Sequence, residues 1–136
     1  MTNQQRIEAA FRLMDGHEWD KLDSFQHPTC ENRFNADAFP NRDAFVAMCK
    51  GWYSAFPDLK HDIIDFIDGG DRVAYTVRVT GTHTAPFHSP KGTVPATGKR
   101  IDFRAADVVK LGLDGRATSW HVFTDTIEFM KQLGLV

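Results

Sequence analysis

The sequence lacks a long hydrophobic run, a surplus of basic charge and an extensive set of cysteines. No stretch approaches the roughly 18 consecutive apolar residues that a membrane-spanning helix needs. The first residues, MTNQQRIEAAFRLM, also lack the apolar run of a secretory signal. The 16 lysines and arginines are outnumbered by 18 acidic residues, so a basic patch for nucleic acid or lipid headgroups is not expected. We therefore expect a cytoplasmic protein with no nucleic-acid partner and no membrane partner.

Metal sites and disulfide bonds are not indicated either. The two cysteines, Cys30 and Cys49, have no CxxC spacing, so both are expected to be reduced thiols. The six histidines show no HxH, HxxxH or HExxH spacing that would place two metal ligands on one element. We expect neither a metal nor a cofactor.

Aromatic residues, in contrast, are plentiful, with 11 Phe, 3 Trp and 2 Tyr in 136 residues. With 42% hydrophobic and 25% charged residues, the composition is that of a globular protein. The length suits one domain over residues 1–136. The aromatic side chains suit either a large core or the walls of an apolar ligand pocket, and composition leaves both open.

Hydrophobic periodicity predicts helices first, then mostly strands, then a last short helix. Helices are expected between Thr2 and Gly16 and at residues 17–25, 42–56 and 126–133, with Ile127, Met130 and Leu133 inward on the last one. Strands are expected at 31–35, 59–67 and 72–83, and on both sides of a turn at 112–115. Residues 85–98 hold three of the six prolines and predict a loop, which is a candidate lip of a pocket. We expect an α+β domain in which a curved antiparallel sheet wraps three N-terminal helices as a cone with room for a ligand.

One acid stands out in the stretch from Lys99 to Asp125, which predicts a long hairpin because apolar and polar residues alternate around Asp114-Gly115. Side chains alternate along a strand, so Asp107 shares a face with the apolar residues Ile101, Phe103, Ala105 and Val109. On the second strand the residues expected to face the same interior are Trp120, Val122 and Thr124. A carboxylate in these surroundings must be paired, protonated or used in chemistry.

Three polar residues are candidates for catalysis, each with a structural alternative. Asp107 is either a general acid or base with a pKa raised by apolar neighbours, or an acid that hydrogen-bonds a loop or a histidine. Asn32 either holds a carbonyl or enolate oxygen or caps backbone groups. His83, where a strand meets the loop, is either a base at the pocket mouth or an anchor for the loop.

A larger set of side chains is predicted to face the interior and line a binding pocket, although such stripes suit a plain core equally well. These residues are Trp120, Tyr75, Val122, Phe103, Ala105, Trp52, Phe34 and Val77. A buried hydroxyl at Tyr75 needs a partner, which Asp107 or a ligand would supply. His121 and Phe123 face the opposite way, which predicts a subunit interface on the outer face of the sheet.

Several short motifs occur in a characteristic order and spacing: Ala55-Phe56-Pro57-Asp58-Leu59, Gly81-Thr82-His83-Thr84 leading to Phe87, Thr97-Gly98-Lys99, Asp114-Gly115 and Lys131-Gln132-Leu133-Gly134. Together they resemble the SnoaL-like polyketide cyclases. These belong to the nuclear-transport-factor-like, ketosteroid-isomerase-like superfamily of cone-shaped α+β folds. The resemblance covers nearly the whole chain and implies a homodimer. The superfamily contains cyclases, isomerases, dehydratases, epoxide hydrolases and non-catalytic binders.

The resemblance also implies roles for single positions. Asn32, a few residues after a His-Pro pair, matches an asparagine of the characterised cyclases. Val122 stands where those enzymes place their catalytic aspartate, whereas Ala105 and Asp107 stand where they tend to carry a glutamine and a histidine. Asp107 also falls where ketosteroid isomerases place an aspartic acid that donates a hydrogen bond to the developing oxyanion.

These observations favour an enzyme that performs cofactor-free acid/base chemistry, such as aldol cyclisation, isomerisation or dehydration, on an apolar cyclic or polyketide-like carbonyl compound. Asp107 would be the acid or base, Asn32 would orient the carbonyl, and His83 or Tyr75 would assist. One alternative is a non-catalytic ligand-binding module of the same fold, with Asp107 ionised and paired. Another is an interaction domain whose cone is filled by its own side chains.

Overall fold

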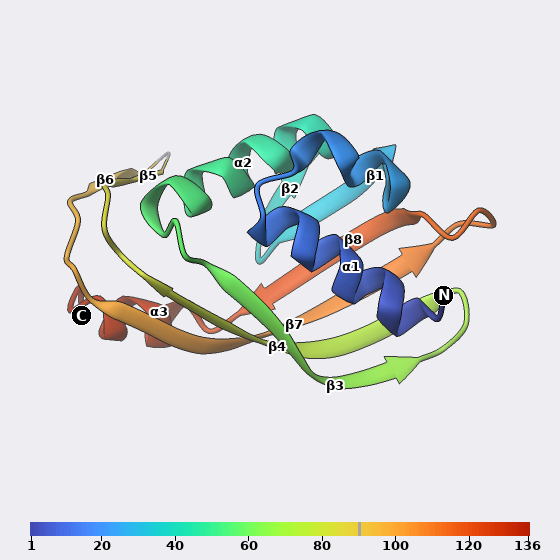
Figure 1. Cartoon of the computed structure of the whole chain (residues 1–136). Helices are drawn as coiled ribbons and strands as arrows, with labels where there is room; N and C mark the ends of the chain where they lie inside the picture. Colours follow the sequence, from blue (N-terminus) through green and yellow to red (C-terminus); the bar gives the residue numbers. More distant parts are fainter. Residues whose placement is uncertain (90) are drawn as a thin grey trace.

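A curved sheet and the helices on its concave side make up the molecule (Figure 1). The computed structural model describes residues 1–89 and 91–136. The strands of the large sheet are β1 Gln26–Phe34, β2 Asp37–Phe39, β3 Lys60–Asp68, β4 Arg72–Thr82, β7 Arg100–Leu111 and β8 Ala117–Thr124. These six strands lie in the order β2-β1-β8-β7-β4-β3, so β8 and β7 occupy its centre.

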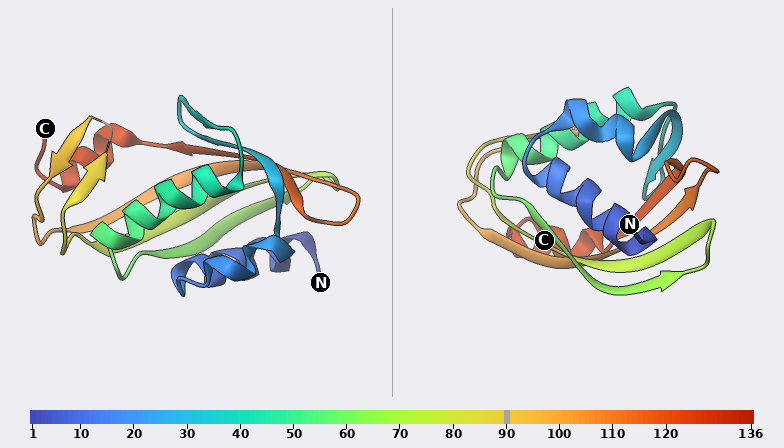
Figure 2. Two further views of the ribbon diagram at one scale, coloured as in Figure 1. Left: turned by 90° about the horizontal axis from the view of Figure 1, so that it is seen from above. Right: turned by 45° about the vertical axis from the view of Figure 1, so that its right-hand side comes forward.

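The two long helices begin at side chains that cap them. Helix α1 (Asn3–Asp15) begins at Thr2, which forms a capping box, and helix α2 (Arg42–Ala55) begins at Asn41, whose side chain accepts a backbone hydrogen bond. Each helix buries one apolar stripe, which in α1 consists of Ile7, Ala10, Phe11 and Met14. The sheet curls around both helices, and this gives the predicted cone (Figure 2).

The two short helices differ in part from the prediction. The expected helix at 17–25 is a 3-10 helix, η1 (Trp19–Ser24). In helix α3 (Thr126–Gln132) the prediction that Ile127 faces inward is wrong, since this side chain is 64% exposed. Phe129 is buried instead, with its ring 5.1 Å from Trp52 and 5.7 Å from Phe103. A helix this short offers more than one apolar stripe, and the packing partners select the stripe.

The predicted hairpin is present as β7 and β8. Asp107 pairs with Val122 of β8 on one side and with Tyr75 of β4 on the other. Buried and exposed residues alternate along the whole of β7, so Asp107 faces inward among apolar residues as expected. The turn between the strands uses Gly115 with a φ of 82°, a conformation that glycine adopts without strain.

The sequence predicts an antiparallel sheet, but one pair of neighbouring strands is parallel. Strand β1 pairs with β8 in the parallel direction and places Asn32 beside Trp120. Side-chain alternation has the same period in both directions, so the pattern carries no information on strand direction. Strand β1 also begins earlier than the predicted 31–35, at Gln26, and its pairing with β8 shifts register between Gln26 and Glu31, the interval that contains Pro28.

The predicted loop at 85–98 contains a small hairpin of strands β5 (Phe87–Ser89) and β6 (Gly92–Val94). Strands of three residues are too short to show a periodicity. Pro90, also part of that predicted loop, lies outside the described residues. Phe87 packs against α2 with its ring 4.8 Å from Trp52, so the hairpin covers that end of the helix. Along residues 1–89 and 91–136, no helix combines the length and the hydrophobicity needed to cross a membrane.

Candidate functional site

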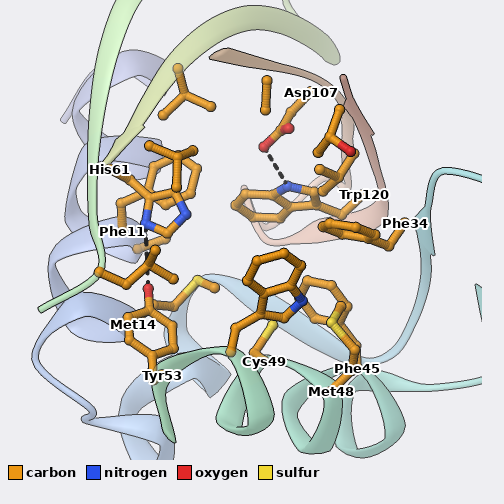
Figure 3. Close-up of a pocket in the computed structure, with 18 of the residues that line it drawn as sticks. Phe11, Met14, Phe34, Phe45, Met48, Cys49, Tyr53, His61, Asp107 and Trp120 are labelled. Atoms are coloured by element: carbon orange, nitrogen blue, oxygen red, sulfur yellow. Dashed lines mark hydrogen bonds between the residues drawn. The ribbon is translucent and has the colours of Figure 1, made fainter. Parts of the chain in front are cut away.

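A mostly apolar cavity of about 80 Å3 lies between the concave face of the sheet and helices α1 and α2 (Figure 3). Most of its wall consists of hydrocarbon, aromatic and sulfur groups, including Phe11 and Met14 from α1 and Phe45, Met48, Cys49 and Trp52 from α2. The polar residues of the wall include Gln26, His61 and Asp107. The cavity is smaller than the roughly 300 Å3 of an ordinary ligand pocket, so it has room for only part of a small organic molecule.

Asp107 is the buried acid of this cavity. Its carboxyl is 3% exposed, and both of its hydrogen bonds go to one oxygen. The Tyr75 hydroxyl donates to Oδ2 at 2.8 Å and the Trp120 indole N–H donates to Oδ2 at 3.1 Å. Oδ1 is buried and has no hydrogen-bond partner among the described residues. The carboxyl is therefore held by Oδ2, while the hydrogen-bonding capacity of Oδ1 is left unsatisfied.

The surroundings of Asp107 change its acidity. Burial disfavours the charged form and raises the pKa of Asp107 from 3.8 to about 6, although the hydrogen bonds from Tyr75 and Trp120 and the nearby His61 pull in the opposite direction. A carboxyl with a pKa near 6 is present in both protonation states close to neutral pH. It has the acidity that general acid/base catalysis requires.

A second polar cluster, which sequence reasoning missed, lies at another part of the cavity wall (Figure 3). His61 of β3 lines the cavity, and its Nδ1 lies 2.8 Å from Oδ1 of Asp15. Tyr53 donates its hydroxyl to the same oxygen at 2.6 Å. Alternation alone leaves the facing of His61 open, because β3 carries a register shift between Ile63 and Asp65. The sequence offers one sign of this cluster: Asp15 stands at the C-terminal end of α1, where the helix dipole disfavours negative charge, so this acid is expected to have a stabilising partner.

Asn32 lies behind the cavity wall rather than in it. Its amide is fully buried and exchanges two hydrogen bonds with Gln26, at 2.9 and 3.1 Å, and donates a third to the Cys30 carbonyl at 3.2 Å. Gln26 itself lines the cavity. The structure thus brings Gln26, which sequence reasoning did not single out, to the position expected for Asn32.

His83 also lies outside the cavity wall. It is fully buried, stacks on Phe56 with ring centres 4.9 Å apart, and accepts the Thr97 N–H on Nδ1 at 3.2 Å. Burial lowers the pKa of His83, which favours the neutral ring. These contacts tie the end of β4 to the segment before β7.

Most of the predicted pocket residues have side chains in the cavity wall: Trp120, Val122, Phe103, Ala105, Trp52, Phe34 and Val77. Tyr75 is the exception. It lies behind Asp107, stacks on Phe66, packs edge-on against Phe11 of the wall, and donates its hydroxyl to Asp107. In the described part of the chain, no group of three or more His, Cys, Asp or Glu residues is placed to hold a metal ion.

The conical α+β arrangement is the nuclear-transport-factor-like fold. An NTF2-like protein of unknown function from Burkholderia pseudomallei K96243 superposes with a TM-score of 0.78 at 13% identity, covering 98% of each chain. At this level of identity the likeness concerns the fold.

Within this class, the family model of the SnoaL-like polyketide cyclases matches residues 3–133, and the chain belongs to that family. TsrD from Streptomyces laurentii has a TM-score of 0.84 and 22% identity, covering 98% of this chain and 95% of its own. A SnoaL-like polyketide cyclase from Agrobacterium tumefaciens C58 has a TM-score of 0.80 and 18% identity, covering 98% of this chain and 99% of its own. The comparison with curated proteins found no match.

Proposed function

We propose that this chain is an enzyme that uses its own side chains for acid/base chemistry on an apolar cyclic or polyketide-like carbonyl compound. One observation carries the proposal: Asp107 is buried in an apolar cavity with Oδ1 free, and its pKa is raised to about 6. A group that is partly protonated near neutral pH both donates and accepts a proton.

The chemistry begins with protonated Asp107 donating a hydrogen bond from Oδ1 to the substrate carbonyl. Tyr75 and Trp120 keep Oδ2 in place, so the proton on Oδ1 is directed at the substrate. As a neighbouring base takes a proton from the adjacent carbon, Asp107 transfers its own proton to the oxygen and an enol forms. The enol carbon attacks a second carbonyl in a cyclisation, regains a proton elsewhere in an isomerisation, or expels a hydroxyl group in a dehydration.

The size of the cavity limits which part of the substrate enters it. A volume of about 80 Å3 accommodates the reacting carbonyl and its immediate neighbours. Phe34, Met48, Trp52 and Val122 line the cavity and are only partly buried, so the remainder of a larger substrate extends along these side chains. In this arrangement the Gln26 amide, oriented by Asn32, is the neutral group that contacts a second oxygen of the substrate.

The test is the pKa of Asp107, measured by carbon-detected NMR titration with Asp107→Asn to assign the resonance. The proposal expects a value near 6. Turnover of aryl diketones to ring-closed products should fall about 100-fold or more in Asp107→Asn. Asp102→Asn, which changes an exposed acid on the same strand, serves as the control. A pKa at or below about 4 would contradict an acid/base role.

The second candidate function is a non-catalytic ligand-binding module. It is favoured by the two hydrogen bonds to Oδ2, since each lowers the pKa of Asp107 and stabilises an ionised, paired carboxylate. A binding module predicts that Asp107→Asn changes ligand affinity modestly and that no carbonyl compound is turned over by the wild-type protein.

A further inference from the structure

Asp107 accounts for the proton on the substrate oxygen, whereas His61, Asp15 and Tyr53 form a separate polar cluster. His61 lines the cavity together with Asp107, and its ring stacks on Phe11 with centres 4.7 Å apart and an interplanar angle of 11°. In the close-up, Asp107 lies at the top of the cavity and His61 at its left (Figure 3). The two residues therefore border the same space, which a substrate would occupy.

Asp15 orients the imidazole of His61. The carboxylate receives three hydrogen bonds: from the Tyr53 hydroxyl at 2.6 Å, from His61 Nδ1–H at 2.8 Å and from the His61 backbone N–H at 2.9 Å. Because Asp15 accepts at Nδ1, the proton of a neutral ring is held there and Nε2 carries the free lone pair. The ring nitrogen remote from Tyr53 points toward the middle of the cavity (Figure 3). This is the geometry of a base held in one tautomer by a carboxylate.

His61 also borders a groove of about 670 Å3 on the outside of the molecule, between α1 and the start of β3. Phe11, Asp15 and Leu59 line this groove as well. The His61 ring is thus part of the wall that separates the interior cavity from solvent. A proton that His61 takes from a molecule in the cavity can therefore be released to solvent in the groove.

We propose that His61 is a second catalytic residue, which exchanges a proton with a substrate carbon while Asp107 serves the substrate oxygen, and that Asp15 is its positioning residue. This inference rests on the proposed function. In the forward step, Nε2 of neutral His61 takes a proton from the carbon next to the carbonyl. The C–H electrons form the C=C bond of the enol, and the carbonyl oxygen takes the proton of Asp107.

The step balances without any further reactant. It leaves an imidazolium, a carboxylate and an enol. In an intramolecular aldol closure, the enol carbon bonds to the second carbonyl carbon, the alkoxide takes the imidazolium proton, and the enol O–H returns its proton to Asp107. Both side chains end in their starting protonation states, and the product is an isomer of the substrate.

The arrangement also defines the substrate class. Imidazole is a weak base, and one ketone group alone leaves the neighbouring C–H bond only weakly acidic. The carbon that His61 deprotonates must therefore carry a second activating group, either another carbonyl or an aromatic ring. The carbonyl oxygen and the acidic carbon are both bonded to the carbonyl carbon, so the two reacting atoms lie close together. This suits a compact cavity whose wall contains both Asp107 and His61. We expect β-dicarbonyl compounds and aryl-substituted ketones.

The experiment uses 2-tetralone, an apolar bicyclic ketone whose C1 hydrogens are activated by both the carbonyl and the ring. Exchange of these hydrogens in deuterium oxide is followed by proton NMR. Wild-type protein should accelerate the exchange, His61→Gln should lose about 100-fold of the acceleration, and Asp15→Asn about 10-fold. His88→Gln, which changes an exposed histidine on β5, is the matched control and should exchange at the wild-type rate.

Nitrogen NMR of His61 in the free protein provides a readout that does not depend on the substrate. We expect a ring protonated at Nδ1 with a free Nε2, and loss of this preference in Asp15→Asn. A ring protonated at Nε2 would overturn the inference. Exchange that is unchanged in His61→Gln but lost in Asp107→Asn would overturn the role of His61 and leave the proposed function standing. A wild-type protein that does not accelerate exchange, with an Asp107 pKa at or below about 4, would overturn both.

Discussion

The Asp107 carboxyl destabilises the folded chain at neutral pH. Its pKa is 3.8 when exposed and about 6 in the fold, because burial disfavours the carboxylate. Below about pH 3, under both pKa values, the carboxyl is mostly protonated in the folded and the unfolded chain, so its burial carries almost no penalty. As the pH rises toward 6 the unfolded chain releases this proton first, and the free energy of unfolding falls. The acid is therefore retained against stability, which is the pattern expected of a functional group.

Replacement of this acid by a neutral amide should remove the penalty. One pKa unit corresponds to about 1.36 kcal/mol, so Asp107→Asn should gain on the order of 2 kcal/mol relative to wild type between pH 4 and pH 7. Urea unfolding of both proteins at the two pH values measures this gain. Asp102→Asn, at an exposed position, should show no such gain with pH. A difference between Asp107→Asn and wild type that stays constant from pH 4 to pH 7 would mean that the native carboxyl is ionised throughout.

Single residues differ in how far the sequence reveals their roles. The position of Asp107 follows from the alternation of β7, and its contact with Tyr75 follows from the need of a buried hydroxyl for a partner. The pair of His61 and Asp15 does not follow from any local pattern, because the two residues are 46 positions apart and come from different elements. Only the packing of α1 against β3 brings them together.

At the scale of elements, helix α2 supplies one wall of the cavity and ends beside the β5–β6 hairpin. Its residues Met48, Cys49 and Trp52 face the cavity because they recur at helical spacing on one side. The helix begins at Asn41, whose side chain accepts the Ala44 N–H at 2.9 Å. Stability of this wall thus depends in part on a cap outside the cavity.

Loss of the cap should destabilise the protein without altering the site. Asn41→Ala should lower the free energy of unfolding by about 1 kcal/mol, because one backbone N–H at the helix start loses its partner. Chemical denaturation measures the change. Ser54→Ala, at an exposed position within the same helix, is the control and should remain within about 0.5 kcal/mol of wild type. An Asn41→Ala protein as stable as wild type would show that solvent replaces the cap fully.

At the scale of the whole molecule, the convex face of the sheet carries apolar side chains that point to solvent. Val108 of β7 is 43% exposed and Phe123 of β8 is 51% exposed, on adjacent strands. His121 lies beside Val108 on the same face. We propose that a second copy of the chain covers this face, because a homodimer would bury these side chains while leaving the cavity on the concave side open.

A charge on this face should separate the copies. Phe123→Lys should shift the mass measured by size-exclusion chromatography with light scattering from that of a dimer to that of a monomer. The reason is that a buried lysine without a partner is costly in an interface. Ser54→Lys, on the exposed side of α2, should leave the mass unchanged. A wild-type protein that elutes as a monomer at micromolar concentration would contradict a dimer through this face.

The sequence by itself determined the order of the main elements, the inward face of β7 and the family. These depend on periodicity, capping residues and short motifs, which are local in the chain. Tertiary structure alone decided the parallel direction of β1, the burial of Phe129 in place of Ile127, the positions of Asn32 and His83 behind the wall, and the meeting of Asp15 with His61. Each of these depends on contacts between distant segments, and a pattern of period 2 or 3.6 describes one element at a time.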